Sequence, residues 1–148
     1  MKTTNQPVSL TLWLNRILMT VIIVLSLFLP TLLRWYNGFR PLGPAQNLAV
    51  MIAFYLCVPI AEFALWNLEI LLRNISKEQV FVSGNVTTIA RVCLCCAVVS
   101  IICLGGALFY APLVFMSLIM GFLCPVVNVV RQVMKAAIEI REENDLTI

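Results

Sequence analysis

Apolar residues form three long segments that are separated by short polar stretches. The segment from Ile17 to Leu33 has 17 residues without a charge, and the segment from Leu48 to Leu72 has 25 residues interrupted by only three polar ones. The segment from Val92 to Val130 has 39 residues without Lys, Arg, Asp or Glu. A helix needs about 20 residues to cross a bilayer. The third segment therefore predicts two helices, and the chain predicts four.

Gly105, Gly106 and Pro112 interrupt the third segment and predict a tight hairpin near Tyr110–Pro112. The predicted fold is all-α, a polytopic membrane protein with four transmembrane helices in one domain, residues 1–148. The spans are expected at about 14–33, 48–72, 87–109 and 113–130, with a loop at 73–91 and a tail at 131–148. The fourth helix is expected to continue beyond the membrane to about Glu139.

Composition supports lipid as the solvent for much of the chain. Hydrophobic residues make up 61% of the sequence and charged residues 11%, against roughly 45–50% and about 25% in soluble domains. A soluble fold of this size lies too close to its own surface to hide so much apolar area. This excludes a secreted disulfide scaffold, a disordered tail and a nucleic-acid-binding domain, and we expect no direct contact with nucleic acid.

Basic residues gather on one side of the predicted topology. With four spans, the N-terminal tail, the loop 73–91 and the C-terminal tail share one side, which holds eight of the 10 Lys and Arg residues. The other side has only Arg34 and Arg40. Because basic loop residues favour the cytoplasmic side, we expect both termini in the cytoplasm. No small-x-small cleavage site follows the first segment, so we expect it to be retained.

Aromatic residues fit the same topology. Trp13 lies at the expected inner interface, and Trp35, Tyr36 and Tyr110 lie at the outer one. Amphipathic rings prefer this depth, where one part of the ring is apolar and another is wet.

Small and weakly polar residues mark the predicted contact between the third and fourth helices. Such residues let helix backbones approach closely in a membrane. They recur at helical spacing on one face of each helix, and a tight hairpin would press the two faces together. The expected packing seam consists of Cys93, Cys96, Ser100, Cys103, Ser117, Gly121, Cys124 and Asn128. Pro125 should kink the fourth helix, either as a hinge or as static shape.

Glu62 is the most unusual residue in the second segment. It lies 11 residues before Arg73, about 16 Å at 1.5 Å per residue, which places it near the middle of the bilayer. An acid at that depth is a candidate functional site, and Tyr55, Ser26 and Ser100 are its candidate partners. A neutral glutamic acid that holds helices together is the alternative. Glu69 and Arg73 are spaced for an ion pair near the inner interface.

Residues that carry chemistry elsewhere are scarce. The chain has no histidine and six cysteines, and no second close-set cysteine pair completes a tetrahedral metal site with Cys93, Cys95 and Cys96. We find no phosphate-binding glycine loop, nucleophile–base pair or paired carboxylates. We therefore expect no enzyme activity, no metal and no cofactor.

The C-terminal tail alternates apolar and charged positions. Val130, Met134, Ala137 and Ile138 form an apolar edge of an amphipathic helix, which is followed by several acidic residues. The tail is either a solvated, frayed end or a docking segment for a cytoplasmic protein. The candidate docking residues, including the loop before the third helix, are Phe81, Asn85, Arg91, Arg141, Glu142, Glu143, Asp145 and Leu146.

Phe81, Asn85, Arg91 and the ending from Arg141 to Ile148 resemble a bacterial four-span membrane family, domain of unknown function 2975. The resemblance covers most of the chain from Leu48 onward, and the closing Glu-Asn-Asp-Leu-Thr-Ile is its most specific part. Thr87 and Thr88 stand where the family would lead us to expect more basic residues. The resemblance implies a bacterial plasma (inner) membrane protein, without catalytic residues, often encoded beside a small Cro/CI-like helix-turn-helix regulator.

These observations lead to three functional hypotheses. The first is a regulatory or scaffolding protein that holds a cytoplasmic partner, such as a transcription regulator, at the membrane. The second is a small transport or channel component in which Glu62 binds a proton or cation. The third is a subunit that stabilises a homo-oligomer or a larger membrane complex.

Overall fold

The computed structural model describes residues 5–77 and 82–146, with side chains for 8–77 and 82–144. It consists of four helices, α1 (Asn5–Phe39), α2 (Pro44–Ser76), α3 (Ser83–Ala107) and α4 (Leu113–Leu146). The described residues contain no strand. All four helices are long and apolar enough to cross a membrane, which confirms the predicted all-helical, four-span architecture.

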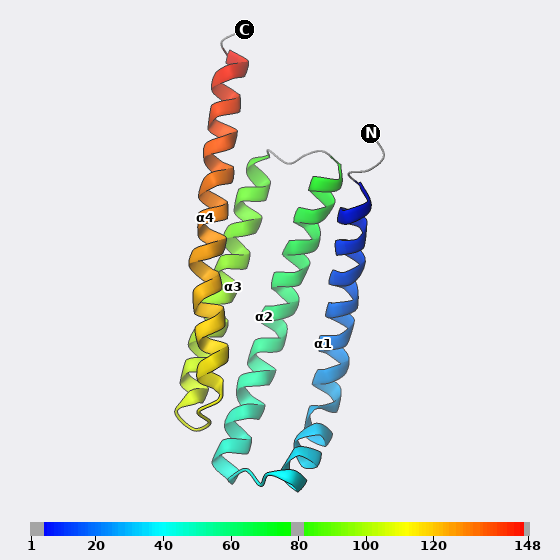
Figure 1. Ribbon diagram of the computed structural model, residues 1–148, viewed down its shortest axis with the longest axis vertical. Coiled ribbons are helices and arrows are strands. Elements are labelled where there is room, and N and C mark those ends of the chain that lie inside the picture. Colours follow the sequence, from blue (N-terminus) through cyan, green and yellow to red (C-terminus); the bar gives the residue numbers. More distant parts are fainter. Residues whose placement is uncertain (1–4, 78–81, 147–148) are drawn as a thin grey trace.

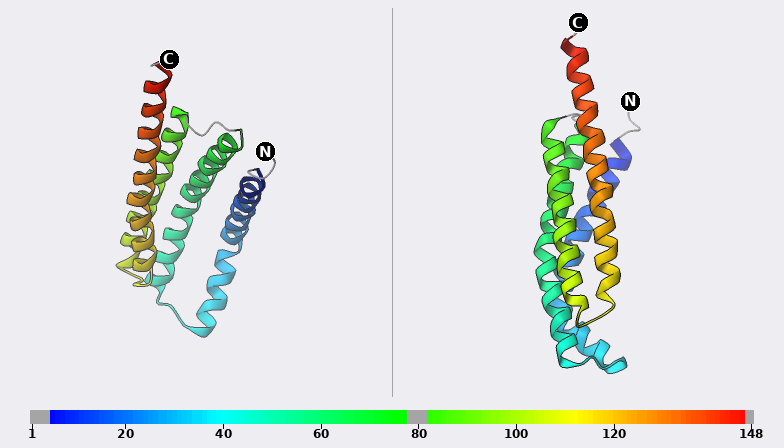
Figure 2. Two further views of the ribbon diagram at one scale, coloured as in Figure 1. Left: turned by 45° about the horizontal axis from the view of Figure 1, so that its top comes forward. Right: turned by 90° about the vertical axis from the view of Figure 1, so that its left-hand side faces the viewer.

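The helices form an open row instead of a closed bundle. Figure 1 shows them in the order α4, α3, α2, α1 across the molecule, and each helix packs only on its neighbours in the chain within the described part. The two views in Figure 2 show α3 and α4 as a close pair, with α1 at the far edge of the row. The helices therefore enclose no central channel in one copy of the chain.

The start of α1 and the end of α4 lie at the same end of the row, which we call the terminal end (Figure 1). The opposite end, which we call the hairpin end, carries the α1–α2 and α3–α4 connections. An even number of membrane crossings requires this arrangement. The upper part of α4 rises beyond the other three helices at the terminal end (Figure 1).

Many large apolar side chains are exposed and several polar side chains are buried, which is the reverse of the distribution in a soluble protein. Large apolar side chains such as Leu27, Phe115 and Ile101 are about two-thirds exposed or more. The accessible surface is 10376 Å², against roughly 7,600 Å² for a compact soluble protein of this mass. Polar side chains fill the helix contacts instead, and the buried ones are Asn15, Asn67, Glu69, Asn85, Thr88 and Ser117. Lipid around the helices accounts for both observations.

The connection between α1 and α2 is stabilised by local hydrogen bonds. The Leu42 amide donates to Asn37 Oδ1 at 3.1 Å, and the Gly43 amide donates to Gln46 Oε1 at 3.1 Å. Pro44 begins α2, where its missing N–H costs nothing.

Pro30 lies inside α1, and α1 changes direction in its light-blue second half (Figure 2), as expected where a proline removes a helical hydrogen bond.

A tight turn joins α3 to α4 where the sequence predicts it. The Tyr110 amide donates to the Gly106 carbonyl at 3.0 Å, and the Leu113 amide donates to the Tyr110 carbonyl at 3.0 Å. A Cβ atom at Gly106 would lie 2.7 Å from Leu113 Cδ1 and 3.5 Å from Ala53 Cβ. A side chain at position 106 would therefore displace the end of the Leu113 side chain, whereas its contact with Ala53 of α2 would be an ordinary one.

All four helices extend further at the terminal end than the sequence indicates. The stretch 73–91, expected as a loop, is helical up to Ser76 and again from Ser83. The fourth helix, expected to end at about Glu139, continues to Leu146. Residues 140–146 contain good helix formers and no Gly or Pro. Their intrinsic helix propensity therefore extends α4 without packing against another helix.

Candidate functional site

A charged cluster lies between α1 and α2 near the terminal end. Glu69 Oε1 accepts from Arg16 Nε at 3.1 Å and Arg16 Nη2 at 3.0 Å, and from Arg73 Nη2 at 2.6 Å. The Glu69 side chain is 8% exposed, whereas the side chains of Arg16 and Arg73 are 57% and 56% exposed. One buried carboxylate thus holds two arginine side chains that are more than half exposed.

Amide side chains surround this cluster and connect three helices. Asn15 Nδ2 donates to the Leu65 carbonyl at 3.1 Å, which ties α1 to α2. Asn74 Nδ2 donates to Asn85 Oδ1 at 2.8 Å, which ties α2 to α3. Asn67 Nδ2 donates to the Phe63 carbonyl of its own helix at 2.7 Å. In a membrane the hydrophobic effect does not hold helices together, and hydrogen bonds between helices contribute to their association instead.

The predicted ion pair between Glu69 and Arg73 is confirmed, but the sequence reasoning missed Arg16 and the buried amides. The pair lies within one helix, so helical spacing was sufficient to find it. Arg16 belongs to another helix, 53 residues away in sequence. The available signal was the Asn15–Arg16 pair at the edge of the first span, at the depth expected for Glu69.

Glu62 lies in the middle of α2 and its Oε1 atom is buried without a hydrogen-bond partner. The Arg16 and Arg73 guanidiniums are bound to Glu69, seven residues further along α2. An oxygen that is buried without a partner is costly to hold as a carboxylate. Glu62 therefore remains the candidate intramembrane acid.

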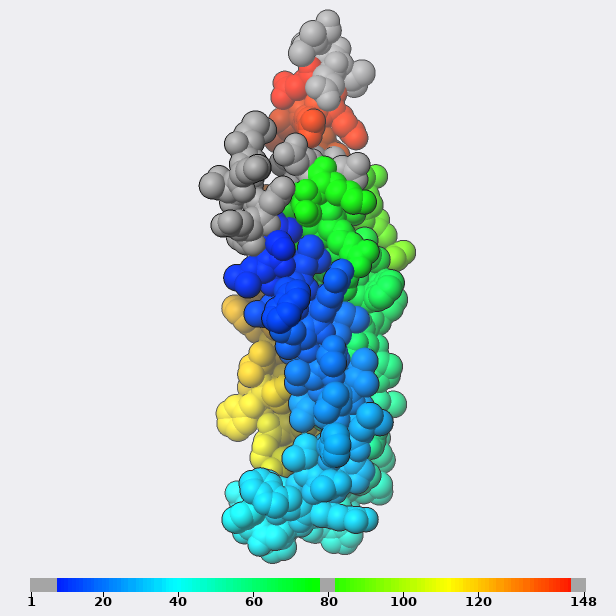
Figure 3. Space-filling view, turned by 90° about the vertical axis from the view of Figure 1, so that its right-hand side faces the viewer, coloured from blue at the N-terminus to red at the C-terminus, as the bar shows by residue number. Residues whose placement is uncertain are grey.

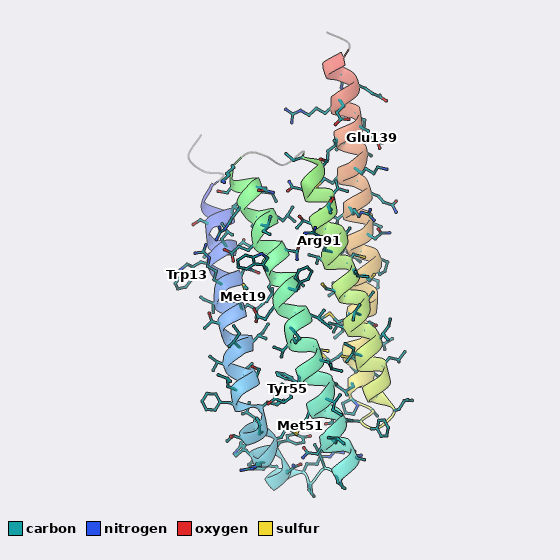
Figure 4. All side chains as sticks on the ribbon, turned by 180° about the vertical axis from the view of Figure 1, so that it is seen from behind. Trp13, Met19, Met51, Tyr55, Arg91 and Glu139 are labelled. Carbon is teal, nitrogen blue, oxygen red and sulfur yellow. The ribbon has the colours of Figure 1, made fainter. Side chains whose placement is uncertain are left out.

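The residues expected around Glu62 do not form a single group. The Tyr55 hydroxyl donates to the Ser26 carbonyl at 3.2 Å between α2 and α1, and Figure 4 shows Tyr55 between these helices. The Ser26 hydroxyl donates to Ile23 of its own helix. Ser100 lies on α3, which makes no contact with α1 in the described part of the chain, and it is bonded to α4. Tyr55 and Ser26 are thus together, and Ser100 is separate from Ser26.

The contact between α3 and α4 contains most of the predicted seam. The Ser100 hydroxyl donates to the Ser117 carbonyl at 2.8 Å, and the Ser117 hydroxyl donates to the Ser100 carbonyl at 2.9 Å. A Cβ atom at Gly121 would lie 3.1 Å from Ser100 Oγ. Cys93 Sγ donates to the Cys124 carbonyl at 3.2 Å. Small residues thus let the two backbones approach closely.

Two further seam residues, Cys96 and Asn128, are half-buried, and Cys96 lies close enough to Cys124 of α4 to interact with it electrostatically. Cys103 is buried and interacts with Cys57 of α2, so it belongs to the α2–α3 contact. Cys95 is also buried. All six cysteines are free thiols, and no group of three or more side chains that could hold a metal ion is found in the part that the structure describes.

The candidate docking residues divide into a buried and an exposed group. Asn85 is fully buried and bonded to Asn74, so its side chain serves the α2–α3 contact and offers no docking surface. Arg91 is exposed on α3, and Arg141, Glu142 and Glu143 are exposed on α4. Phe81 and the side chains of Asp145 and Leu146 lie outside the described residues.

Two tyrosines come together at the hairpin end. The Tyr36 hydroxyl, by hydrogen bonding, and burial raise the pKa of Tyr110 above its usual value, and the nearby Arg40 opposes this shift. The end of α1 therefore approaches the α3–α4 turn, although α3 and α4 themselves do not pack against α1 within the described residues.

Four apolar helices with polar contacts between them define a multi-pass membrane protein. The sequence matches the family described as "Protein of unknown function (DUF2975)" over residues 5–148, and the chain belongs to that family. The match also includes α1, which precedes the part of the chain from Leu48 onward that carries the resemblance. In comparisons with curated proteins and with solved structures, nothing matches.

Proposed function

We propose that the protein is a non-enzymatic membrane scaffold that holds a cytoplasmic protein, a helix-turn-helix transcription regulator, at the bacterial plasma membrane through the end of α4. The observation that carries this proposal is the continuation of α4 beyond the other helices (Figure 1). Residues 139–144 of this helix are all exposed. In this proposal both termini are cytoplasmic, as the distribution of Lys and Arg favours.

The exposed stretch of α4 has the composition of a helix that docks into a groove. Val133 and Ile140 are 64% and 60% exposed and lie seven residues apart, on one face. Lys135 and Glu139 form an exposed ion pair at 3.7 Å, and Figure 4 shows Glu139 above the other helices. An apolar stripe beside charged residues is the pattern by which amphipathic helices are recognised.

The test compares partner recovery by tagged full-length protein and by a variant that ends after Ala137, both solubilised from native membranes in mild detergent. We expect the truncated variant to lose a DNA-binding protein that the full-length chain recovers. A Val133→Glu/Ile140→Glu variant should lose it as well, because two charges break the apolar stripe.

The matched control is Lys135→Gln/Glu139→Gln, which alters two exposed residues of the same stretch without changing the net charge. It should recover the partner as the unaltered chain does. Circular dichroism and gel filtration must show the same helix content and size for all variants. Equal recovery of the DNA-binding protein with and without residues 138–148 would refute the proposed role of α4.

A second candidate function is transport of a proton or cation by Glu62, which the unpartnered Oε1 atom favours. Because one copy forms an open row, a pathway past Glu62 would require several copies. Proteoliposomes with the unaltered protein should then show a flux that Glu62→Gln abolishes and Glu142→Gln retains. A flux that is unchanged by Glu62→Gln would remove the support for transport.

A further inference from the structure

We infer that Arg16 and Arg73, held together by Glu69, form a binding site for the phosphate group of an anionic phospholipid on the α1–α2 surface. Both guanidiniums contact the same oxygen, Glu69 Oε1, at 3.0 and 2.6 Å. The shared oxygen keeps the two guanidiniums within reach of one phosphate. This inference is independent of the proposed partner of α4.

The charges of the cluster do not cancel. Arginine is always protonated in proteins, so a single carboxylate leaves the cluster with one net positive charge. One arginine would be sufficient to tie α1 to α2 through Glu69. The second arginine adds a charge that the ion pair does not need, and α1 contains no acidic residue that would neutralise it.

Burial separates the acid from the bases. Glu69 is 8% exposed, while more than half of each arginine side chain faces outward. A ligand that approaches from outside meets two guanidiniums and almost none of the carboxylate. Glu69 occupies only some of the five N–H donors of each guanidinium, and the others remain available for phosphate oxygens.

The depth of the cluster matches that of lipid headgroups. Trp13 precedes Arg16 by three residues and is 67% exposed, and Trp66 precedes Glu69 by three residues and is 58% exposed. Trp13 points outward from α1 (Figure 4), and tryptophans in this position mark the membrane–water boundary. The space-filling view in Figure 3 shows α1 and α2 side by side at this end of the molecule, without α4 covering them.

These features select the ligand chemistry. Two arginines at a fixed spacing suit the oxygens of a phosphate group, and apolar helix surface below the cluster suits acyl chains. A net positive site prefers a lipid with a net negative headgroup, such as phosphatidylglycerol, to a zwitterionic one. A free phosphate shares the headgroup chemistry but gains nothing from the apolar surface.

The experiment measures lipid binding to the full chain in detergent by native mass spectrometry, with phosphatidylglycerol and phosphatidylcholine of identical acyl chains as probes. We expect phosphatidylglycerol to bind more tightly than phosphatidylcholine. The variant Arg16→Gln/Glu69→Gln/Arg73→Gln should bind phosphatidylglycerol about tenfold more weakly, because it loses charge-assisted hydrogen bonds. Binding of phosphatidylcholine should be unchanged.

Glu69→Gln provides a second variant that keeps both arginines, since the amide oxygen still accepts hydrogen bonds. It raises the net charge of the site, so phosphatidylglycerol should bind at least as tightly as to the unaltered chain. Weaker binding by folded Glu69→Gln would contradict the inference. This variant keeps the inference testable if the triple variant fails to fold.

Arg34→Gln/Arg40→Gln is the matched control, because it removes two basic residues from the hairpin end. It should retain the binding of phosphatidylglycerol, and an equal loss in this control and the triple variant would refute a specific site. Inorganic phosphate alone is the last probe. Protection of the unaltered chain against heat by phosphate as large as that by phosphatidylglycerol would show that the ligand is a free phosphate and overturn the lipid assignment.

Discussion

Single side chains decide how closely the helices of this protein approach. Ser100 and Ser117 exchange hydrogen bonds with each other's carbonyl groups, and Gly121 leaves the space in which Ser100 Oγ lies. In a bilayer, apolar side chains are solvated equally well by lipid and by another helix. Small and polar residues therefore provide the specificity that a packed apolar core provides in water.

At this scale we predict that Gly121→Ala destabilises the α3–α4 hairpin by about 1 kcal/mol. The new Cβ atom would lie 3.1 Å from Ser100 Oγ and would push it away from the Ser117 carbonyl. Unfolding in sodium dodecyl sulfate, followed by circular dichroism, measures the free energy of unfolding.

Gly105→Ala is the control for this prediction. No atom lies within 4 Å of a Cβ at Gly105, and alanine favours a helix over glycine. The control should therefore be as stable as the unaltered chain or slightly more stable. The same free energy of unfolding for both variants would mean that the contact at Gly121 is not tight.

The elements differ in how firmly they are attached. The helices α3 and α4 form a hairpin with several hydrogen bonds, and α2 lies in the middle of the row. Helix α1 lies at the edge and packs on no other helix than α2 within the described residues, although Tyr36 near its end meets Tyr110 of the α3–α4 turn. Its polar links to α2 include the Asn15–Leu65 and Tyr55–Ser26 hydrogen bonds and the Arg16–Glu69 ion pair. These polar contacts attach α1 to the edge of the row.

We predict that Glu69→Ala loosens α1 selectively. The variant removes the buried carboxylate that holds Arg16 against α2, so the amides of α1 should exchange hydrogen with solvent at least about tenfold faster. Hydrogen exchange measured by mass spectrometry in detergent resolves the helices separately, and α3 and α4 should be unaffected.

Glu139→Ala is the matched control for this prediction. It removes a carboxylate from an exposed ion pair with Lys135, and exposed pairs contribute little. Exchange in α1 should not change in this variant. Faster exchange spread evenly over all four helices in Glu69→Ala would show that Glu69 supports the whole fold and not α1 alone.

The whole molecule is an open row whose connections alternate between two ends. Such a row leaves both faces of the middle helices exposed to lipid or to another protein. Gly43 and Ala111 lie in the two connections at the hairpin end. Ser83, which begins α3, and Asn144, near the end of α4, lie at the terminal end.

We predict that single cysteines at these four positions, in a chain whose native cysteines are replaced, report two sides of the membrane. A maleimide that does not cross the membrane, added to intact cells, should label Gly43→Cys and Ala111→Cys if the hairpin end is outside, as the distribution of basic residues favours. Ser83→Cys and Asn144→Cys should be labelled only after the cells are opened. Labelling of Gly43→Cys and Ser83→Cys from the same side would contradict the four-span topology.

Features that arise within one helix were predictable from the sequence. The four spans, the turn at Tyr110–Pro112 and the ion pair between Glu69 and Arg73 depend on hydropathy, on residues that break helices and on helical spacing. These are local properties, and a helix in lipid satisfies its own backbone hydrogen bonds without help from its neighbours. The all-helical fold therefore follows from the order of residues alone.

Contacts between helices were decided by the tertiary structure. The addition of Arg16 to Glu69, the hydrogen bond from Asn15 to the Leu65 carbonyl and the burial of Asn85 against Asn74 each join residues from different helices. Hydropathy does not reveal which helices are neighbours, because lipid and protein are equally apolar surroundings for a leucine. The order of the helices in the row separates Ser26 from Ser100 and brings two arginines to one carboxylate. The spacing of residues within a single helix does not determine which helices become neighbours, so the sequence pattern could not predict this arrangement.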